Sequence, residues 1–368
     1  MDALLRDPEV GIIVCCGSGG VGKTTTAAAL ALRAAEGGRK VVVLTIDPAR
    51  RLAQSMGLSA LDNTPRPVPD IDTTAGGSLD AMMLDMKRTF DEVVEQHASP
   101  PKAAQILANP FYQAVSSSFA GTQEYMAMEK LGQLHEDARR SARWDLIVVD
   151  TPPSRSALDF LDAPERLASL LDGRFIRLLM TPARGPARLF SAGLGVVTAA
   201  LSKVLGAQLL RDAQTFVSAI DALFGGFRQR AERTFALLQA DETAFIVVAA
   251  PESGALREAA YFVERLNKEH MPLAGLVLNR VTDDFVPGLP ATAADAAARR
   301  LGRTAEHPVT AHVLQLHAER AAAIAREERL LMRFSAAHPT VPVAHAAELA
   351  TDVHDLDGLR SVGNMLSG

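Results

Sequence analysis

The sequence feature that most constrains this 368-residue chain is a glycine-rich octapeptide, GSGGVGKT, at residues 17–24. The apolar run VGIIVCC precedes it, and the helix-forming run TTTAAALALRAAEGG begins at its last residue. The pattern G-x-x-x-x-G-K-[ST] between a strand and a helix is typical of a loop that binds phosphate. Glycines let successive main-chain N–H groups face phosphate oxygens, and the helix directs its positive end to the same place. We therefore predict that residues 17–24 cradle the phosphates of a nucleotide.

Two polar side chains of this segment, those of Lys23 and Thr24, have predicted roles. Lys23 is expected to reach the β- and γ-phosphates, and Thr24 to offer its hydroxyl to Mg²⁺. The predicted cofactors are therefore ATP and Mg²⁺. The residues expected to contact the nucleotide here are Gly19, Gly20, Val21, Gly22, Lys23, Thr24 and Thr25.

Further apolar runs of strand length alternate with helical stretches along the chain. They lie at residues 40–47, 79–85, 144–150, 243–250 and 272–279. Runs that are apolar on both faces are typical of parallel strands covered by helices on both sides. We predict an α/β fold of the P-loop NTPase kind, with a mostly parallel central sheet flanked by helices. The chain is expected to form a single domain, 1–368, with a helical subdomain inserted within about residues 86–140 and 155–240.

Polar residues end three of the predicted strands, and in such sheets ligands bind beyond the carboxyl ends of the strands. Asp150 is predicted to join the Mg²⁺ shell, partly through water, with a cap on the next turn as the alternative. Asp47 is predicted to orient the attacking water, and its alternative is an Asx-turn. Asn279 is placed to bond a base edge, although a structural cap is also open to it.

Composition and local patterns exclude several classes of function. A net charge of −5 provides no basic field for nucleic acid. Guanine-specific relatives use Asn-Lys-x-Asp, and the nearest match here, NKEH at 267–270, lacks the Asp, which favours ATP. The only cysteines are the adjacent Cys15 and Cys16, without the spacing of a zinc site. The start MDALLRDPEV has neither a signal-peptide nor a transit-peptide pattern, so a cytoplasmic location is expected.

The order of these motifs resembles the ArsA/Get family, the arsenite-pump and tail-anchored-protein-targeting ATPases, over nearly the whole chain. The motifs are the glycine loop, DPA at 47–49, VVDTPPS at 148–154 and VLNR at 277–280. The resemblance implies that Asp47 lies in switch I and positions the attacking water, so that Asp47 and Lys23 are the expected catalytic residues. It also implies that Asp150 begins switch II and that Asn279 contacts adenine. Pro342 and Val343 resemble the segment that packs on the adenine.

The chain departs from the family pattern at Ser18. Family members usually carry a second, signature lysine here, which reaches the partner's phosphates across a dimer interface. A hydroxyl brings no charge, so stabilisation in trans is weakened or is supplied differently. Either hydrolysis is slow, or a partner chain contributes the cation, and we favour the second. The arsenite-binding cysteines and the CxxC of zinc-linked dimers are absent, so metalloid export is not expected.

These observations lead to one main hypothesis and one alternative. The first is a Mg-dependent ATPase that works as a homodimer or as a heterodimer with a paralogous ATPase. Its helical subdomain would engage a hydrophobic protein client or a membrane partner, placing it in the cytoplasm or at the membrane periphery, and no nucleic acid is involved. Apolar residues within 178–197 suit a client groove, although a plain helical core explains them too. The alternative is an ATP-dependent dimerisation or partitioning-type switch with slow turnover and no motor or transport activity.

Overall fold

The computed structural model describes residues 1–47, 51–110, 112–113, 122–152, 229–303 and 307–367. The chain divides into two compact units. The first comprises Met1–Met83, Ala138–Ala157 and Leu238–Gly368, and the second Leu84–Asp137 and Leu158–Leu237. The segment proposed as a client groove, 178–197, lies outside the described residues, so the helical subdomain and its role stay predictions.

The first unit contains an eight-stranded sheet with the strand order β3-β4-β2-β5-β1-β6-β7-β8. All neighbouring strands pair in parallel except β3 and β4, which are antiparallel. The predicted α/β fold with a mostly parallel sheet is confirmed. The strands are β1 Ile12–Gly17, β2 Lys40–Thr45, β3 Arg66–Pro67, β4 Ser78–Met83, β5 Leu146–Asp150, β6 Thr243–Ala249, β7 Leu273–Val281 and β8 Val343–Ala347.

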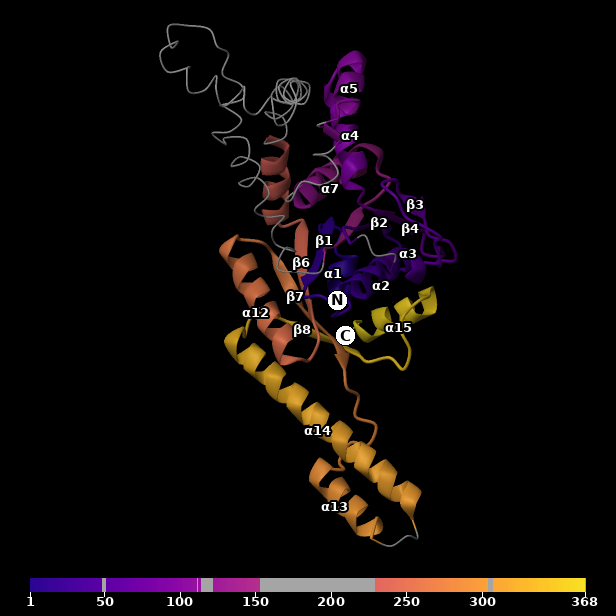
Figure 1. Ribbon diagram of the computed structural model, residues 1–368, viewed down its shortest axis with the longest axis vertical. Helices are drawn as coiled ribbons and strands as arrows, with labels where there is room; N and C mark the ends of the chain where they lie inside the picture. Colours follow the sequence, from indigo (N-terminus) through magenta and orange to yellow (C-terminus); the bar gives the residue numbers. More distant parts are fainter. Residues whose placement is uncertain (48–50, 111, 114–121, 153–228, 304–306, 368) are drawn as a thin grey trace, which may run out of the picture. The chain divides into compact units, whose positions relative to one another are not determined.

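Every residue of β1, β5 and β6 is buried, which explains why these runs are apolar without alternation. Helix α2 (Lys23–Glu36) packs on β1, β2, β4 and β5. Helix α15 (Leu356–Met365) packs on α2 and β8. Helix α12 (Ser253–Lys268) packs on β1, β6 and β7, and Figure 1 places it on the other side of the sheet from α2. The alanines of α2 favour the helix and let it lie close to the sheet, because their side chains are small. The remaining short helices of this unit are α1 Asp2–Arg6 and α3 Arg51–Ser55.

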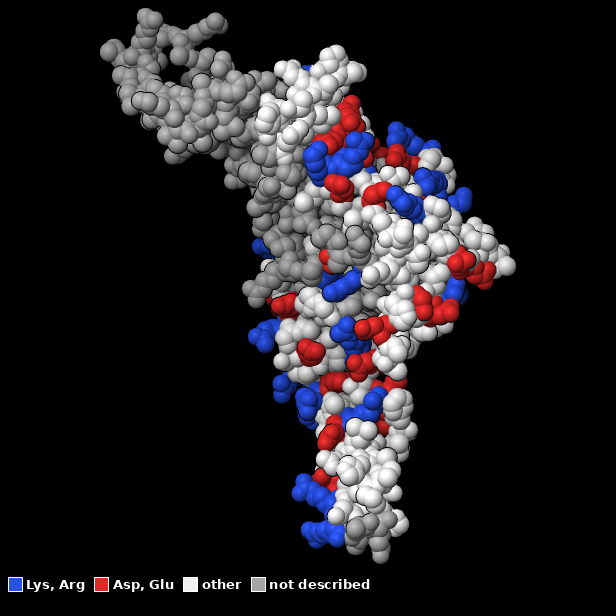
Figure 2. All heavy atoms as spheres, turned by 45° about the vertical axis from the view of Figure 1, so that its right-hand side comes forward, with Lys and Arg blue, Asp and Glu red and all other residues white. Residues whose placement is uncertain are grey.

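A helical hairpin connects β7 to β8. It consists of α13 (Ala291–Leu301) and α14 (Pro308–Ala337), which pack on each other (Figure 1). Val309, Val313 and Leu316 recur at helical spacing on α14, and their exposed fractions are 74%, 60% and 67%. In Figure 2 the lower end of the molecule, where this hairpin lies, has an uncharged strip with basic side chains along one edge. Among the helices that the structure describes, none is both long enough and apolar enough to cross a bilayer.

The described part of the second unit is helical. It contains α4 (Met86–His97), α5 (Pro100–Leu107), most of α7 (Thr122–Ser141) and the helical residues 229–237. Glu129 of α7 is buried and accepts hydrogen bonds of 2.9 and 3.0 Å from Nε of Arg230. This ion pair joins the two pieces of sequence that build the unit. Because the Glu129 side chain is only 2% exposed, removal of Arg230 would leave an uncompensated buried carboxylate.

Candidate nucleotide-binding site

The glycine loop leaves β1 in a conformation that requires glycine at its two ends. The φ angles of Gly17 and Gly22 are 149° and 91°. A Cβ on Gly17 would lie 2.1 Å from the carbonyl oxygen of Val248, and one on Gly22 would lie 2.2 Å from Nδ2 of Asn279. The ends of the loop therefore lie against Val248 of β6 and Asn279 of β7, with no room for a side chain at either position. Gly22 is also the residue before α2, so the positive end of that helix faces the loop.

Lys23 folds back over the loop that precedes it. Its side chain is buried, and its Nζ donates a hydrogen bond of 2.8 Å to the carbonyl oxygen of Ser18. Burial lowers the pKa of Lys23 below its usual value, while the nearby charges of Asp150 and Asp47 oppose that shift. An ammonium group held in this position by a neutral carbonyl is available to phosphate oxygens, whose charge would compensate for the hydration that Lys23 loses on burial.

Asp150 is held by one oxygen only. Its Oδ2 accepts hydrogen bonds of 2.8 Å from the hydroxyls of Thr24 and Thr45. Its Oδ1 is buried and has no hydrogen-bond partner among the described residues. Burial raises the pKa of Asp150 to about 6, and the two hydroxyl bonds and Lys23 limit the rise.

This arrangement fits a magnesium ion. Carboxylate and hydroxyl oxygens are the ligands that Mg²⁺ prefers, and an unpartnered buried oxygen is otherwise unfavourable. The described residues contain no group of three or more His, Cys, Asp or Glu side chains that could hold a metal alone. Thr24 and Asp150 could hold the ion only together with phosphates and water, which is how Mg²⁺ is commonly bound at nucleotide sites.

Asn279 reaches the loop from the carboxyl end of β7. Its Nδ2 donates a hydrogen bond of 2.9 Å to the carbonyl oxygen of Val21, and its side chain is buried. The tertiary structure thus brings Asn279 beside the cradle, where it braces the loop. Its predicted contact with adenine stays a prediction.

Asp47 lies two residues beyond the end of β2. Its main-chain N–H donates a hydrogen bond of 3.2 Å to the Thr45 hydroxyl, and its charge acts on both Lys23 and Asp150. The predicted water-orienting carboxylate is therefore near the cradle. The next residues, 48–50, lie outside the described part of the chain.

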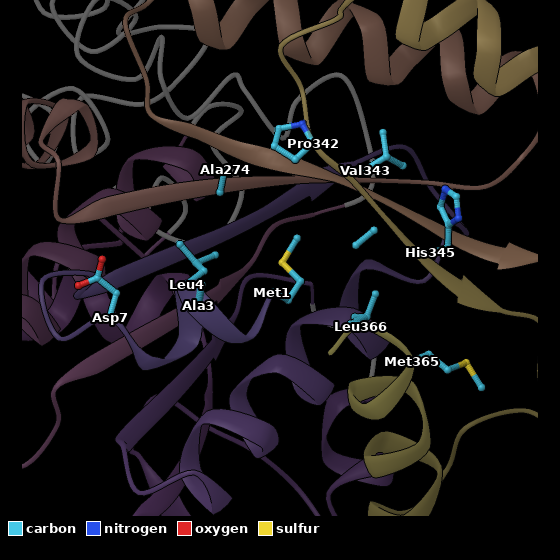
Figure 3. Close-up of a pocket in the computed structure, with 11 residues that line it drawn as sticks. Met1, Ala3, Leu4, Asp7, Ala274, Pro342, Val343, His345, Met365 and Leu366 are labelled. Carbon is cyan, nitrogen blue, oxygen red and sulfur yellow. The ribbon is translucent and has the colours of Figure 1, made fainter. Parts of the chain in front are cut away.

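Pro342 and Val343 are not brought to the cradle. The parallel register of β7 and β8 sets Val343 opposite Leu276 and Ala346 opposite Asn279. Pro342 and Val343 are therefore at the amino end of β8, whereas the cradle lies at the carboxyl ends of the strands. They line a separate cavity of about 660 Å³, with Met1 and Leu4 at the chain start and Leu366 beyond α15 (Figure 3).

The structure also adds Thr45, which sequence reasoning missed. Thr45 ends β2, and the register of β2 and β5 sets it directly beside Asp150. The only local signal was a hydroxyl residue two positions before Asp47. Its partner is 105 residues away in the sequence, so no local pattern identifies it.

Comparison with known proteins decides the family. The model of the anion-transporting ATPases matches residues 10–293, which is most of the chain. The chain belongs to the ArsA ATPase family. The family resemblance inferred from the motifs is thereby confirmed.

Individual relatives of the ArsA ATPase family are similar mainly over part of the chain. An arsenical pump-driving ATPase of Acidiphilium multivorum is 31% identical over 158 residues, which are 42% of this chain and 26% of the relative. ATPase GET3 of Malassezia globosa is 29% identical over 43% of this chain and 44% of its own length. ATPase ASNA1 homolog 2 of Paramecium tetraurelia is 23% identical over 76% of this chain and 78% of its own. The chain thus spans less than half the length of the first two relatives.

Proposed function

We propose that this protein is a magnesium-dependent ATPase whose nucleotide cycle switches the conformation of a dimer that engages a protein or membrane-associated client. One observation carries the nucleotide part of the proposal. Lys23, Thr24 and the half-satisfied carboxylate of Asp150 converge on a glycine loop at the carboxyl edge of the sheet. A triphosphate with its metal ion would satisfy all three groups at once.

Each residue has a distinct task in this cycle. The N–H groups of the loop and the ammonium of Lys23 would bind the β- and γ-phosphates. The hydroxyl of Thr24 and Oδ1 of Asp150, the latter through water, would hold Mg²⁺, which when bound neutralises charge that develops on the phosphates. The carboxylate of Asp47 would accept a hydrogen bond from a water and orient it for attack on the γ-phosphate. Cleavage of the γ-phosphate would remove the group that holds this water, and the segment after β2 would then be released.

The base is proposed to lie beside Asn279. The side-chain amide of Asn279 is at the same edge of the sheet as the loop, and Ala346 of β8 pairs with Asn279. This region replaces Pro342 and Val343 as the place where adenine would pack.

Ser18 supports a partnership with a second chain. Position 18 contributes its carbonyl oxygen to Lys23 and carries no charge on its side chain. A paralogous ATPase with a lysine at this position could supply the missing cation in trans, so we propose a heterodimer before a homodimer. Ser18 equally supports the second candidate, a slow-turnover switch in which ATP holds two chains together without motor activity.

The client is proposed to be a hydrophobic protein or a membrane-associated partner, in the cytoplasm or at the membrane periphery, and not a nucleic acid. We do not propose for this chain the arsenical pump-driving role that the name of one relative states. Burial raises the pKa of Cys15 and of Cys16, the latter to about 12, so neither thiol offers a thiolate to a metalloid.

Calorimetry with the full chain tests the nucleotide site. Mg²⁺ and ATP should bind the wild type, and Lys23→Ala should weaken the affinity about a hundredfold or more, because it removes a charge-assisted contact. The control is Lys87→Ala, because Lys87 is an exposed lysine of the second unit. Arg39 is not used, because it ties the start of the chain to the sheet. The proposal fails if the wild type has no affinity for ATP, alone or with a candidate paralogous subunit.

A further inference from the structure

Thr45 occupies a junction between the two halves of the candidate site. It is the last residue of β2 and only 1% exposed, and the parallel register places it beside Asp150 at the end of β5. Its hydroxyl is 2.8 Å from Oδ2 of Asp150 and 3.2 Å from the main-chain nitrogen of Asp47. One hydroxyl thus contacts the residue expected at the metal and the main chain of the residue expected at the water.

The proton count of a hydroxyl decides the direction of these bonds. A threonine hydroxyl has one proton to donate and two lone pairs to accept with. The Asp47 carbonyl oxygen is also near, at 3.4 Å, but the 2.8 Å contact with the carboxylate is shorter and is to a charged acceptor. The proton therefore goes to Asp150, and a lone pair accepts from the N–H of Asp47.

This pattern has a consequence for the carboxylate. Thr24 and Thr45 both donate to Oδ2, so rotation of the Asp150 side chain would break two hydrogen bonds. Oδ1 is left without a partner among the described residues, as the metal site requires. The same Thr45 hydroxyl accepts a hydrogen bond from the main chain of Asp47. A displacement of the Asp150 carboxylate would therefore also displace the segment that carries Asp47.

We propose that Thr45 is a positioning residue for ATP hydrolysis, whose hydroxyl couples the metal-side carboxylate of Asp150 to the water-side segment at Asp47. The inference rests on the proposed ATPase function, because it concerns the same site. Thr45 touches neither phosphate nor water in this scheme. It acts through the groups that do.

Two substitutions separate the hydroxyl from the shape of the side chain. Thr45→Val keeps the branched volume and removes the hydroxyl, whereas Thr45→Ser keeps the hydroxyl and removes a methyl group. With the full chain in excess over ATP, the Val variant should hydrolyse about tenfold to a hundredfold more slowly, the effect expected for loss of buried hydrogen bonds. Its affinity for ATP without Mg²⁺ should stay within about threefold of the wild type, and it should need more Mg²⁺ for half-maximal rate. The Ser variant should recover most of the rate.

Each other outcome overturns the inference. A Val variant as fast as the wild type would mean that the hydroxyl is dispensable, and a Ser variant as slow as Val would mean that only shape matters. Equal loss of ATP affinity with and without Mg²⁺ would point to a purely structural role. If the Val variant does not fold, Thr45→Ala replaces it under the same expectations, with Thr45→Ser as its partner, because both lack the methyl group and only Ser keeps the hydroxyl. A wild type that neither binds nor hydrolyses ATP would instead refute the proposed function.

Discussion

Asp150 brings a carboxylate into a fully buried position at the end of β5. Hydroxyls satisfy one of its oxygens, and burial keeps its pKa near 6, above the ordinary value of 3.8. The residue is therefore poorly matched to its surroundings until a cation approaches. At the scale of a single residue, this mismatch supports the proposal of a ligand site at Asp150 over that of a structural cap.

A pH-dependent stability follows for the protein without nucleotide and Mg²⁺. Between pH about 4 and 6 the folded Asp150 keeps a proton that the unfolded chain releases, so the free energy of unfolding falls as pH rises through this window. Asp150→Asn removes the titration. The free energy of unfolding of the variant minus that of the wild type should be larger at pH 7.5 than at pH 4, by about 1–3 kcal/mol. Urea unfolding at both pH values measures the difference, and an equal difference at the two would contradict the assignment.

Asp47 is predicted to act on the water and not on binding. Asp47→Asn keeps the size of the side chain and removes the charge that orients a water, so ATP affinity should be retained. Single-turnover hydrolysis should fall by about a hundredfold or more, as for loss of a group that assists proton transfer. Asp62→Asn, on an exposed side chain of the same unit, is the matched control. Equal turnover in wild type and Asp47→Asn would remove Asp47 from the mechanism.

At the scale of elements, side chains of α14 bind the segment that follows β7. Glu327 of α14 accepts hydrogen bonds of 2.9 Å from the N–H of Thr282 and 2.6 Å from its hydroxyl. Arg320 adds a bond to the carbonyl oxygen of Asp283 and lies over the ring of Phe285. These contacts hold the long helix near the end of the strand that carries Asn279.

Removal of this fastening should loosen the hairpin. Glu327→Ala breaks both bonds to Thr282 and should lower the free energy of unfolding by about 1–3 kcal/mol. Amide hydrogen exchange in α13 and α14 should rise more than in α2. The neighbouring Glu328→Ala, on an exposed position of the same helix, should change neither quantity measurably. Identical behaviour of the two variants would show that Thr282 and Glu327 do not anchor the hairpin.

At the scale of the whole molecule, we propose that Ser18 limits how much of the chemistry one chain performs without a partner. If the missing cation limits turnover, Ser18→Lys should raise the hydrolysis rate of the protein alone by about tenfold or more, since a charge near the phosphates stabilises the transition state. The matched control is Ser18→Gln, which adds length without charge. Steady-state phosphate release measures both, and no gain with lysine would count against a deficit of charge in trans.

The sequence predicted the sheet because its central strands β1, β5 and β6 are buried on both faces and so are almost wholly apolar. It predicted the loop, Asp150 and Asn279 as neighbours because carboxyl ends of parallel strands share one edge. Pro342 and Val343 came from the family resemblance alone, and the structure sets Val343 at the amino end of β8, opposite Leu276. The residues of β8 are only partly buried, so its sequence carries little signal for register, and a shift of a few residues moves a contact to the opposite end of a short strand.

The amino-acid sequence alone determined the phosphate cradle, because its strand, glycine loop and helix are contiguous and their conformations depend on local residue types. Only the tertiary structure decided how the cradle is completed. Asn279 meets Val21 across 258 residues, and Thr45 meets Asp150 across 105. Such pairs form because the order and register of strands bring distant strand ends together, and that order depends on packing of the whole sheet rather than on any local pattern.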